Sequence, residues 1–243
     1  MRTAIAAAAL MAIAASTPAC SQNRNDDRGA TISRNYPVGG FRQIEVAGPY
    51  DVESRTGGNA AVSAQGSEKL LGRTVVEVKG DKLIIRSQRE KGWFQMGWSN
   101  KGQARFVVTV PELSGATIAG SGDIRVDKVR GQSFRGSVAG SGGLGIGMME
   151  VEMLKLSIAG SGDARVQSGK ARNADYEIAG SGDVDAGGIG AEALKVSIAG
   201  SGNVRANATR TADVSIVGSG DVVVTGGAKC NVRKAGSGDV RCS

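Results

Sequence analysis

Aspartate recurs at a regular spacing through the second half of the chain, and it is the side chain whose pattern could most readily do chemistry. Each of these aspartates ends the pentapeptide Ala-Gly-Ser-Gly-Asp or a close variant of it. If the segments stack in register, the carboxylates form one column, and like charges facing each other in a sheet are destabilising. Some interaction must offset this charge. The members of this aspartate column are Asp123, Asp163, Asp183, Asp221 and Asp239.

Three interpretations assign different chemistry to the aspartate column. In the first, each carboxylate accepts backbone N–H bonds in its own turn and pairs with an arginine two positions on. In the second, the column binds a row of calcium ions through its oxygen atoms. In the third, two carboxylates act on a glycosidic bond of an acidic polysaccharide, which requires two different environments. Because the aspartates share one sequence context, the first is favoured, and we expect no cofactor and no catalytic residue. The arginines concerned are Arg125, Arg165, Arg205 and Arg241.

Composition excludes several other classes of function. The chain has no histidine, so a Ser-His-Asp or Cys-His site and a histidine-ligated zinc site are ruled out. The net charge of +7 lies almost wholly in the first part, because residues 1–111 hold 15 Lys and Arg against 9 acidic residues, whereas residues 112–243 hold 15 against 14. No nucleic-acid-binding motif accompanies this excess, so no nucleic-acid partner is expected.

The element that must position the aspartates is a repeat of 18 to 20 residues. Along each repeat, apolar residues alternate with polar ones, as in Leu194, Val196 and Ile198, and this alternation indicates β-strands. One repeat cannot bury its own apolar side, whereas stacked repeats close a continuous core. Residues 112–243 therefore predict an all-β parallel solenoid of seven coils. Its seven motif serines are Ser121, Ser141, Ser161, Ser181, Ser201, Ser219 and Ser237.

A second outward strip of this solenoid consists of small residues. It holds the serines two positions before each motif alanine, the alanines themselves and then the motif serines, for example Ser157, Ala159 and Ser161. Such a strip is expected to be flat and nearly uncharged. It is interpreted either as a corner where small residues fit or as a face for lateral packing of copies or for an extended ligand.

The start of the chain indicates export. Residues 1–19 have the charged start, short apolar run and small-residue end of a signal peptide. Cys20 is then either the lipidated residue of a bacterial lipoprotein or simply the first residue after cleavage. The polar residues 20–38 are expected to form a tether.

The other two cysteines predict a disulfide at the opposite end. Cys230 and Cys242 lie seven residues before and five residues after Ser237, both on the inward side of the alternation. In an oxidising compartment they can pair and hold the last coil against fraying.

Residues 39–111 are expected to form a more irregular β region that caps the solenoid. Ile44 to Val52 is a divergent copy of the repeat, and further short strands follow it. A basic and aromatic segment then lies between Ile85 and Phe106. It is interpreted either as a cover for the end of the solenoid or as a contact with an anionic surface such as lipid headgroups or acidic glycans. Its candidate contact residues are Arg89, Lys91, Trp93, Phe94, Met96, Trp98 and Lys101.

The order of these segments resembles the GIN-domain family. The resemblance rests on Phe41-x-x-Ile44-x-Val46-x-Gly48-x-x-Asp51-Val52, on Lys82 to Ile85, and on Val107 to Pro111 leading into the Gly-Ser-Gly-Asp repeats. The family is described as the heads of auto-transporter adhesins. The resemblance implies a bacterial envelope protein with a right-handed parallel β-helix, and it brings no reaction and no catalytic residue.

These observations together predict a non-enzymatic, adhesin-like or structural module of the bacterial periplasm, outer membrane or cell surface. Its partner would be a glycan, lipid or protein surface of the envelope or the cell exterior, and self-association into a homo-oligomer is left open. The alternatives from other classes are a carbohydrate-active β-helix enzyme and a calcium-binding solenoid.

Overall fold

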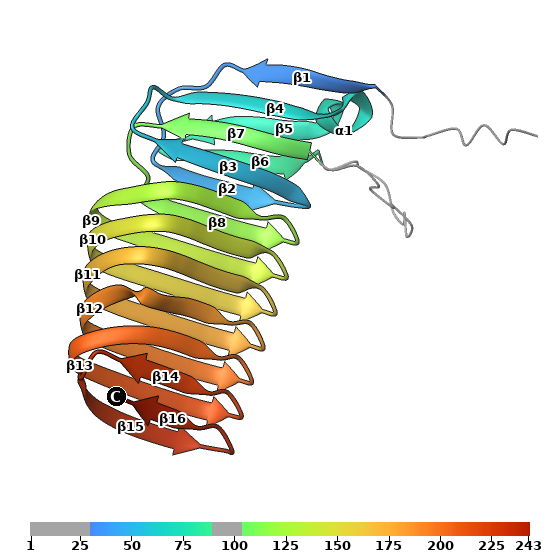
Figure 1. Ribbon diagram of the computed structural model, residues 1–243. Helices are drawn as coiled ribbons and strands as arrows, with labels where there is room; N and C mark the ends of the chain where they lie inside the picture. The colour runs from blue at the N-terminus through green and yellow to red at the C-terminus, as the bar shows by residue number, and fades with distance from the viewer. Residues whose placement is uncertain (1–29, 89–103) are drawn as a thin grey trace, which may run out of the picture.

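The computed structural model describes residues 30–88 and 104–243, and these residues form a β-solenoid of about six turns (Figure 1). This confirms the all-β solenoid predicted from the repeats. The first strands, at the top of Figure 1, are β1 (Thr31–Tyr36), β2 (Gln43–Ala47), β3 (Tyr50–Thr56), β4 (Ala61–Ser67), β5 (Thr74–Lys79), β6 (Lys82–Ser87) and β7 (Ala104–Val110). The remaining strands are β8 (Gly115–Gly120), β9 (Ile124–Gly140), β10 (Gly143–Gly160), β11 (Asp163–Gly180), β12 (Val184–Gly200), β13 (Val204–Gly218), β14 (Val222–Thr225), β15 (Lys229–Ala235) and β16 (Val240–Cys242).

Successive strands pair in parallel with a shift of one whole repeat. In β10 and β11, for example, Leu144 lies beside Ala164 and Ile158 beside Ile178, twenty residues apart. The inward residues of the alternation are buried, as Leu154, Leu156 and Ile158 are. Stacking of these residues along the axis produces the continuous core that one repeat alone could not close.

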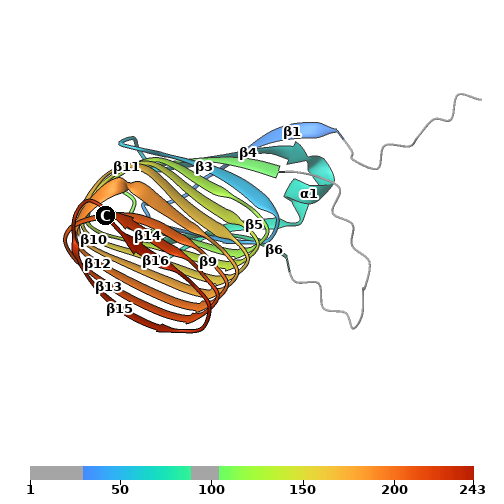
Figure 2. The ribbon, with the colours of Figure 1, turned by 60° about the horizontal axis from the view of Figure 1, so that its bottom comes forward.

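Each coil turns sharply at only one place. The long strands β9 to β13 run 15 to 18 residues without a break, so the second bend of each coil is a curve within a strand. Figure 2, which looks toward the C-terminal end, shows these strands curving around the side of a flattened tube. In the seventh coil, the strand after the corner, β16, has only three residues.

The sharp turn is the Gly-Ser-Gly corner, and stacking dictates its glycines. Gly180 has a φ of +135°, and a Cβ there would collide with the carbonyl oxygen of Gly160 in the coil before. The same carbonyl accepts a hydrogen bond of 2.8 Å from the Ser181 N–H. A side chain at this corner would therefore break both the backbone geometry and the ladder between coils.

The divergent copy near the N-terminus is a true member of the stack. Strands β2 and β3 turn at Gly48, and Val46 and Ala47 pair with Ile118 and Ala119 of β8. Strands β6 and β7 stack in parallel on the other side of β2 and β3, and β5 and β4 then pair with them in antiparallel.

Two elements at this end were not predicted from the sequence. Strand β1 lies within the segment expected to be a tether, and it pairs in antiparallel with β4. Its inward Ile32 and Tyr36 pack against the core, but charged and polar residues between them hide the alternation. Helix α1 (Glu68–Gly72) places Leu70 and Leu71 over the end of the core, and Ser67 caps its first turn.

Candidate binding groove

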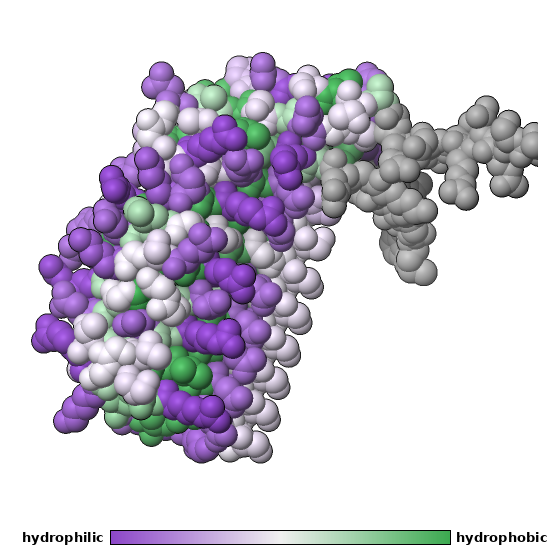
Figure 3. Space-filling view, viewed as in Figure 1, coloured by the Kyte–Doolittle hydropathy of each residue, from purple (hydrophilic) through white to green (hydrophobic). Residues whose placement is uncertain are grey.

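A long groove runs along the solenoid beside the Gly-Ser-Gly corners. It has a volume of about 920 Å³ and is formed by the outward residues at the start of each coil from β9 to β14. In Figure 3 this face is turned toward the viewer, with the corners as a near-white column along one edge. The groove crosses six coils, so it is about 24 Å long. Its charged side chains are Asp123, Asp163, Asp183, Asp185, Asp221, Arg125, Arg165 and Arg205.

The aspartate column forms one wall of the groove, and its carboxylates bind the backbone of the coil that follows. Oδ1 of Asp163 accepts a hydrogen bond of 3.1 Å from the Asp183 N–H, and Oδ1 of Asp183 accepts one of 2.8 Å from Asn203. The same geometry recurs at Asp221 and Asp239. The favoured interpretation placed these bonds within each residue's own turn, whereas the structure places them between coils.

Two positions interrupt the column and reduce its charge. Asn203 donates from Nδ2 to Asp183 and accepts from the Asp221 N–H, so a neutral amide links two carboxylates. Gly143 has no side chain, and the Asp163 N–H there bonds to the Gly142 carbonyl instead. Amide donors and these interruptions together offset the repulsion that the sequence implied.

The arginines of the groove pair less regularly than predicted. Arg125 bonds Asp123 at 3.1 Å, as the two-residue spacing suggested. Arg165 instead pairs at 3.3 Å with Asp185 of the next coil. Arg205 and Arg241 form no ion pair with any residue in the described part of the chain. All of the pairs are exposed, and such pairs contribute little to stability individually.

Strand β10 lacks outward side chains where it crosses the groove. Its residues Gly143, Gly145 and Gly147 alternate with the buried Leu144 and Ile146. The coils on either side carry charged residues at the first two of these positions, so β10 leaves a gap in both charged columns. We call this gap the glycine notch. The alternation of Gly with Leu and Ile is visible in the sequence. Only the register between strands shows which charged residues of the neighbouring coils lie beside these glycines.

The strip of small residues lies on another face and encloses a smaller volume. It forms a depression of about 460 Å³ lined by Ser137, Ser157, Ser197 and three of the motif alanines. The strip is not fully uncharged, because Glu177 also lines it.

Glu177 belongs to a cluster of charges that sequence reasoning missed. Lys155 Nζ lies 2.6 Å from Glu177 and 3.3 Å from Asp175, which stand one coil further on. The hydrogen bond from Lys155 lowers the pKa of Glu177, and the bond to Glu177 raises the pKa of Lys155. The signal for this cluster is the alternation of Lys155, Asp175, Lys195 and Asp213 in one column of the stack.

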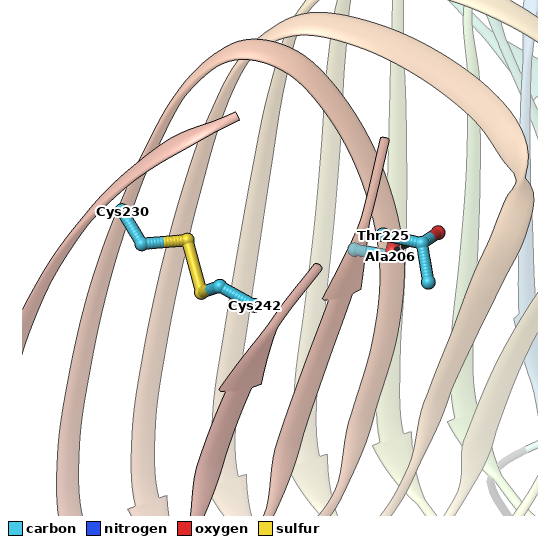
Figure 4. Close-up of a disulfide and its surroundings, with 4 residues drawn as sticks. All are labelled: Ala206, Thr225, Cys230 and Cys242. Carbon is cyan, nitrogen blue, oxygen red and sulfur yellow. Dashed lines mark hydrogen bonds between the residues drawn. A yellow bond between two sulfur atoms is a disulfide. The ribbon is translucent and has the colours of Figure 1, made fainter. Parts of the chain in front are cut away.

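The predicted disulfide is present. Cys230 and Cys242 form it across the interior of the last coil, with their Cα atoms 6.7 Å apart (Figure 4). Both side chains point inward, as the alternation indicated. The bond joins β15 to β16 on the two sides of the final corner.

The calcium interpretation stays a prediction. Within residues 30–88 and 104–243, no group of three or more His, Cys, Asp and Glu is arranged to hold a metal ion. The aspartates of the column lie in different coils, which are about 4.8 Å apart along the axis.

Several candidate residues lie outside the described residues. They are the lipidation candidate Cys20 and the basic and aromatic segment with Arg89, Lys91, Trp93, Phe94, Met96, Trp98 and Lys101. Among the described elements, no helix is long and apolar enough to span a membrane.

Comparison with known proteins agrees with this architecture. Residues 40–228 match the family model described as "Putative auto-transporter adhesin, head GIN domain". A solved structure described as a putative adhesin of Bacteroides fragilis superposes with a TM-score of 0.78 at 22% identity, covering 88% of this chain and 97% of that one. No curated protein matches the chain.

Two solved structures from Parabacteroides distasonis are also similar. One is described as a putative lipid binding protein, with a TM-score of 0.67 and 24% identity over 88% of this chain and 97% of that one. The other is described as a putative adhesin, with a TM-score of 0.64 and 21% identity over 88% and 98%. At these identities the likeness shows the shared fold.

Proposed function

Because this chain belongs to the GIN-domain family of adhesin heads, we propose that it is a non-enzymatic binding module of the bacterial cell envelope. It presents a rigid face of the solenoid to a surface, and the groove along β9 to β14 is the part that makes contact. The observation that carries the proposal is the groove itself, in which charged side chains from five of its six coils lie at corresponding positions.

The stiffness of the groove supports this role. Its walls are strands whose backbone N–H groups are held by the neighbouring coil, as Asp183 and Asn203 are by the carboxylates before them. A site that is ordered before binding loses little conformational entropy when a ligand arrives. Many weak contacts from such a face can then add up to a specific attachment.

The aspartates support binding more than catalysis. Asp163 and Asp221 have equivalent positions. In both, one carboxylate oxygen accepts a hydrogen bond from a backbone N–H of the next coil. Glycosidic hydrolysis requires two carboxyl groups whose environments differ, so that one is an acid and the other a base or nucleophile.

Export and anchoring belong to the same proposal. The signal peptide predicted for residues 1–19 and the Cys230–Cys242 disulfide support an oxidising location outside the cytoplasm. Lipidation at Cys20 would hold the solenoid at the membrane by its N-terminal end. Labelling of cells with a palmitate analogue, with Cys20→Ser as control, tests the anchor: label in both chains contradicts it.

Binding of the exported chain to an array of glycans, lipids and extracellular proteins tests the function. We expect retention on at least one surface and a loss of about tenfold or more when Arg125, Arg165 and Arg205 are all changed to Glu. The control reverses three exposed charges outside the groove, at Arg130, Arg172 and Arg210. No retention on any surface, or equal loss in both variants, contradicts the proposal.

A further inference from the structure

Gly145, in the middle of the glycine notch, is a glycine that the fold does not require. A Cβ built at this position has Arg125 Cγ at 3.8 Å as its nearest neighbour, which is an ordinary van der Waals contact. Its φ lies outside the positive range that favours glycine. The equivalent positions in the coils on either side hold Arg125 and Arg165.

Glycine inside a strand destabilises the fold by about 0.5–1 kcal/mol relative to alanine, because a glycine residue loses more conformational entropy than alanine when the chain folds. At the corners this is explained by stacking, and at Gly147 by the nearby carbonyl oxygen of Asp127. No such reason exists at Gly145. Because Gly145 lies in the groove, unlike the equally unconstrained strand residue Gly190, its missing side chain leaves room there for part of a ligand.

The groups around the notch define the chemistry of what could enter. Arg125 and Arg165 stand on its two sides, about 10 Å apart along the axis. Asp123 and Asp163 stand beside them, so the charges next to the notch balance. The side chains of both arginines are mostly exposed, at 65% and 69%. Each forms one exposed ion pair, with Asp123 and Asp185 respectively, and such a pair is weak enough to open when a ligand binds.

The groove as a whole is unsuited to a polyanion. It holds five aspartates against three arginines, so an acidic chain lying along it would be repelled over most of its length. A cationic chain would meet the arginines at the notch itself. A neutral chain that both donates and accepts hydrogen bonds can use guanidinium and carboxylate groups at once.

We propose that the glycine notch is a subsite for a neutral, linear glycan that lies along the groove. One sugar unit sits on the bare backbone of β10, and its hydroxyl groups bond to Arg125, Arg165, Asp123 and Asp163. This rests on the proposed function and adds the ligand class to it. The groove's length of about 24 Å gives such a chain several coils to contact.

The test fills the notch without changing charge. Gly145→Gln places a side chain where the sugar would lie, and Gly190→Gln is the matched control. A Cβ at Gly190 has nothing within 4 Å, and that residue is not part of the groove. Both variants should keep the melting temperature of the parent chain. An unchanged melting temperature would show that any loss of binding comes from the substituted site and not from unfolding.

Binding is measured on an array of neutral, acidic and amino-containing linear oligosaccharides. We expect the full exported chain to bind at least one neutral oligosaccharide, Gly190→Gln to bind it equally, and Gly145→Gln to bind it at least about tenfold more weakly. Arg165→Gln should also weaken it, because a donor is lost.

Three results decide between this inference and the proposed function. Binding of charged oligosaccharides only, or equal binding by Gly145→Gln and the parent chain, overturns the notch and leaves the adhesive role standing. Failure of the parent chain on this array together with failure on every lipid and protein surface overturns both.

Discussion

The two ends of the solenoid are closed by different means. At the N-terminal end, α1 lays Leu70 and Leu71 over the core, and β1 and β4 add two antiparallel strands. At the C-terminal end, β15 and β16 are the last strands (Figure 2). Most of their side chains are exposed. One end is therefore covered by additional chain, and the other is left as an edge.

Two features stabilise the C-terminal edge in place of additional covering residues. The Cys230–Cys242 disulfide holds its two strands together. Lys234 occupies the column filled by Ile216 in the coil before, and its ammonium donates to the Gly238 carbonyl at 2.8 Å. That bond occupies an acceptor at the end of the stack, where another chain could otherwise add. Basic residues at a sheet edge commonly prevent such pairing.

The two ends of the stack of repeats are stabilised by different interactions. Apolar burial can stabilise an end only where extra residues are available to supply it, as in the N-terminal region. The C-terminal strands instead carry a disulfide and a charged side chain that bonds to the backbone. The two ends should therefore respond differently to mutation, to reductant and to pH.

The largest effect is expected at the covered end. Leu71→Ala removes a fully buried side chain and leaves a cavity, so the free energy of unfolding should fall by about 2–5 kcal/mol. Val232→Ala at the open end should cost less than about 1 kcal/mol, since Val232 is 42% exposed. Urea denaturation measures both. Equal losses would show that the ends are closed in the same way.

The disulfide should act only at the open end. In the paired Cys230→Ser and Cys242→Ser variant, closure of a twelve-residue separation is lost, which is worth roughly 3 kcal/mol. Hydrogen exchange should speed up in β15 and β16 and stay unchanged in β7. Reductant on the parent chain should reproduce the result, and faster exchange in β7 would contradict a local role.

Lys234 should control self-association more than stability. Lys234→Ile restores the residue of the coil before and removes the bond to Gly238. We expect larger species in size-exclusion chromatography with light scattering at high concentration. Arg233→Ile adds the same apolar surface at a neighbouring exposed position and should associate less. If Lys234→Ile behaves like the parent chain, the lysine is not a cap.

The smallest effect is expected in the middle of the stack, at Lys155 and Glu177. Because the pKa of Glu177 is lowered in the fold, its contribution is present above its ordinary value and is lost as the pH falls through the lowered one. The raised pKa of Lys155 contributes below its ordinary value of 10.5 and is lost as the pH rises through the raised one. Both side chains are partly exposed, so the effect is small.

Thermal melts of Glu177→Gln measure this contribution. The variant should melt slightly below the parent chain at about pH 7, and the difference should vanish once the pH lies below the folded pKa of Glu177. Asp213→Asn is the control for the general effect of removing a negative charge, because Asp213 lies in the column of Lys155, beside the column of Glu177. A difference that persists in acid would assign the loss to packing instead.

The repeats made most of the fold predictable, because stacking imposes the same constraint on every copy. The corner glycines, the buried Leu and Ile alternation and the inward cysteines all follow from one spacing. The N-terminal cap was harder to predict: β1 and α1 each occur once, and the polar residues of β1 mask its two core contacts at Ile32 and Tyr36. A single copy offers no internal comparison.

The sequence by itself determined the solenoid, its corners and the position of its disulfide, since these depend on residues at a fixed separation along the chain. The tertiary structure alone decided which partner each charge takes. Arg165 pairs across coils with Asp185, and Gly145 stands between two arginines twenty residues away on either side. Such contacts depend on side-chain reach between adjacent coils, and no spacing along one strand specifies that reach.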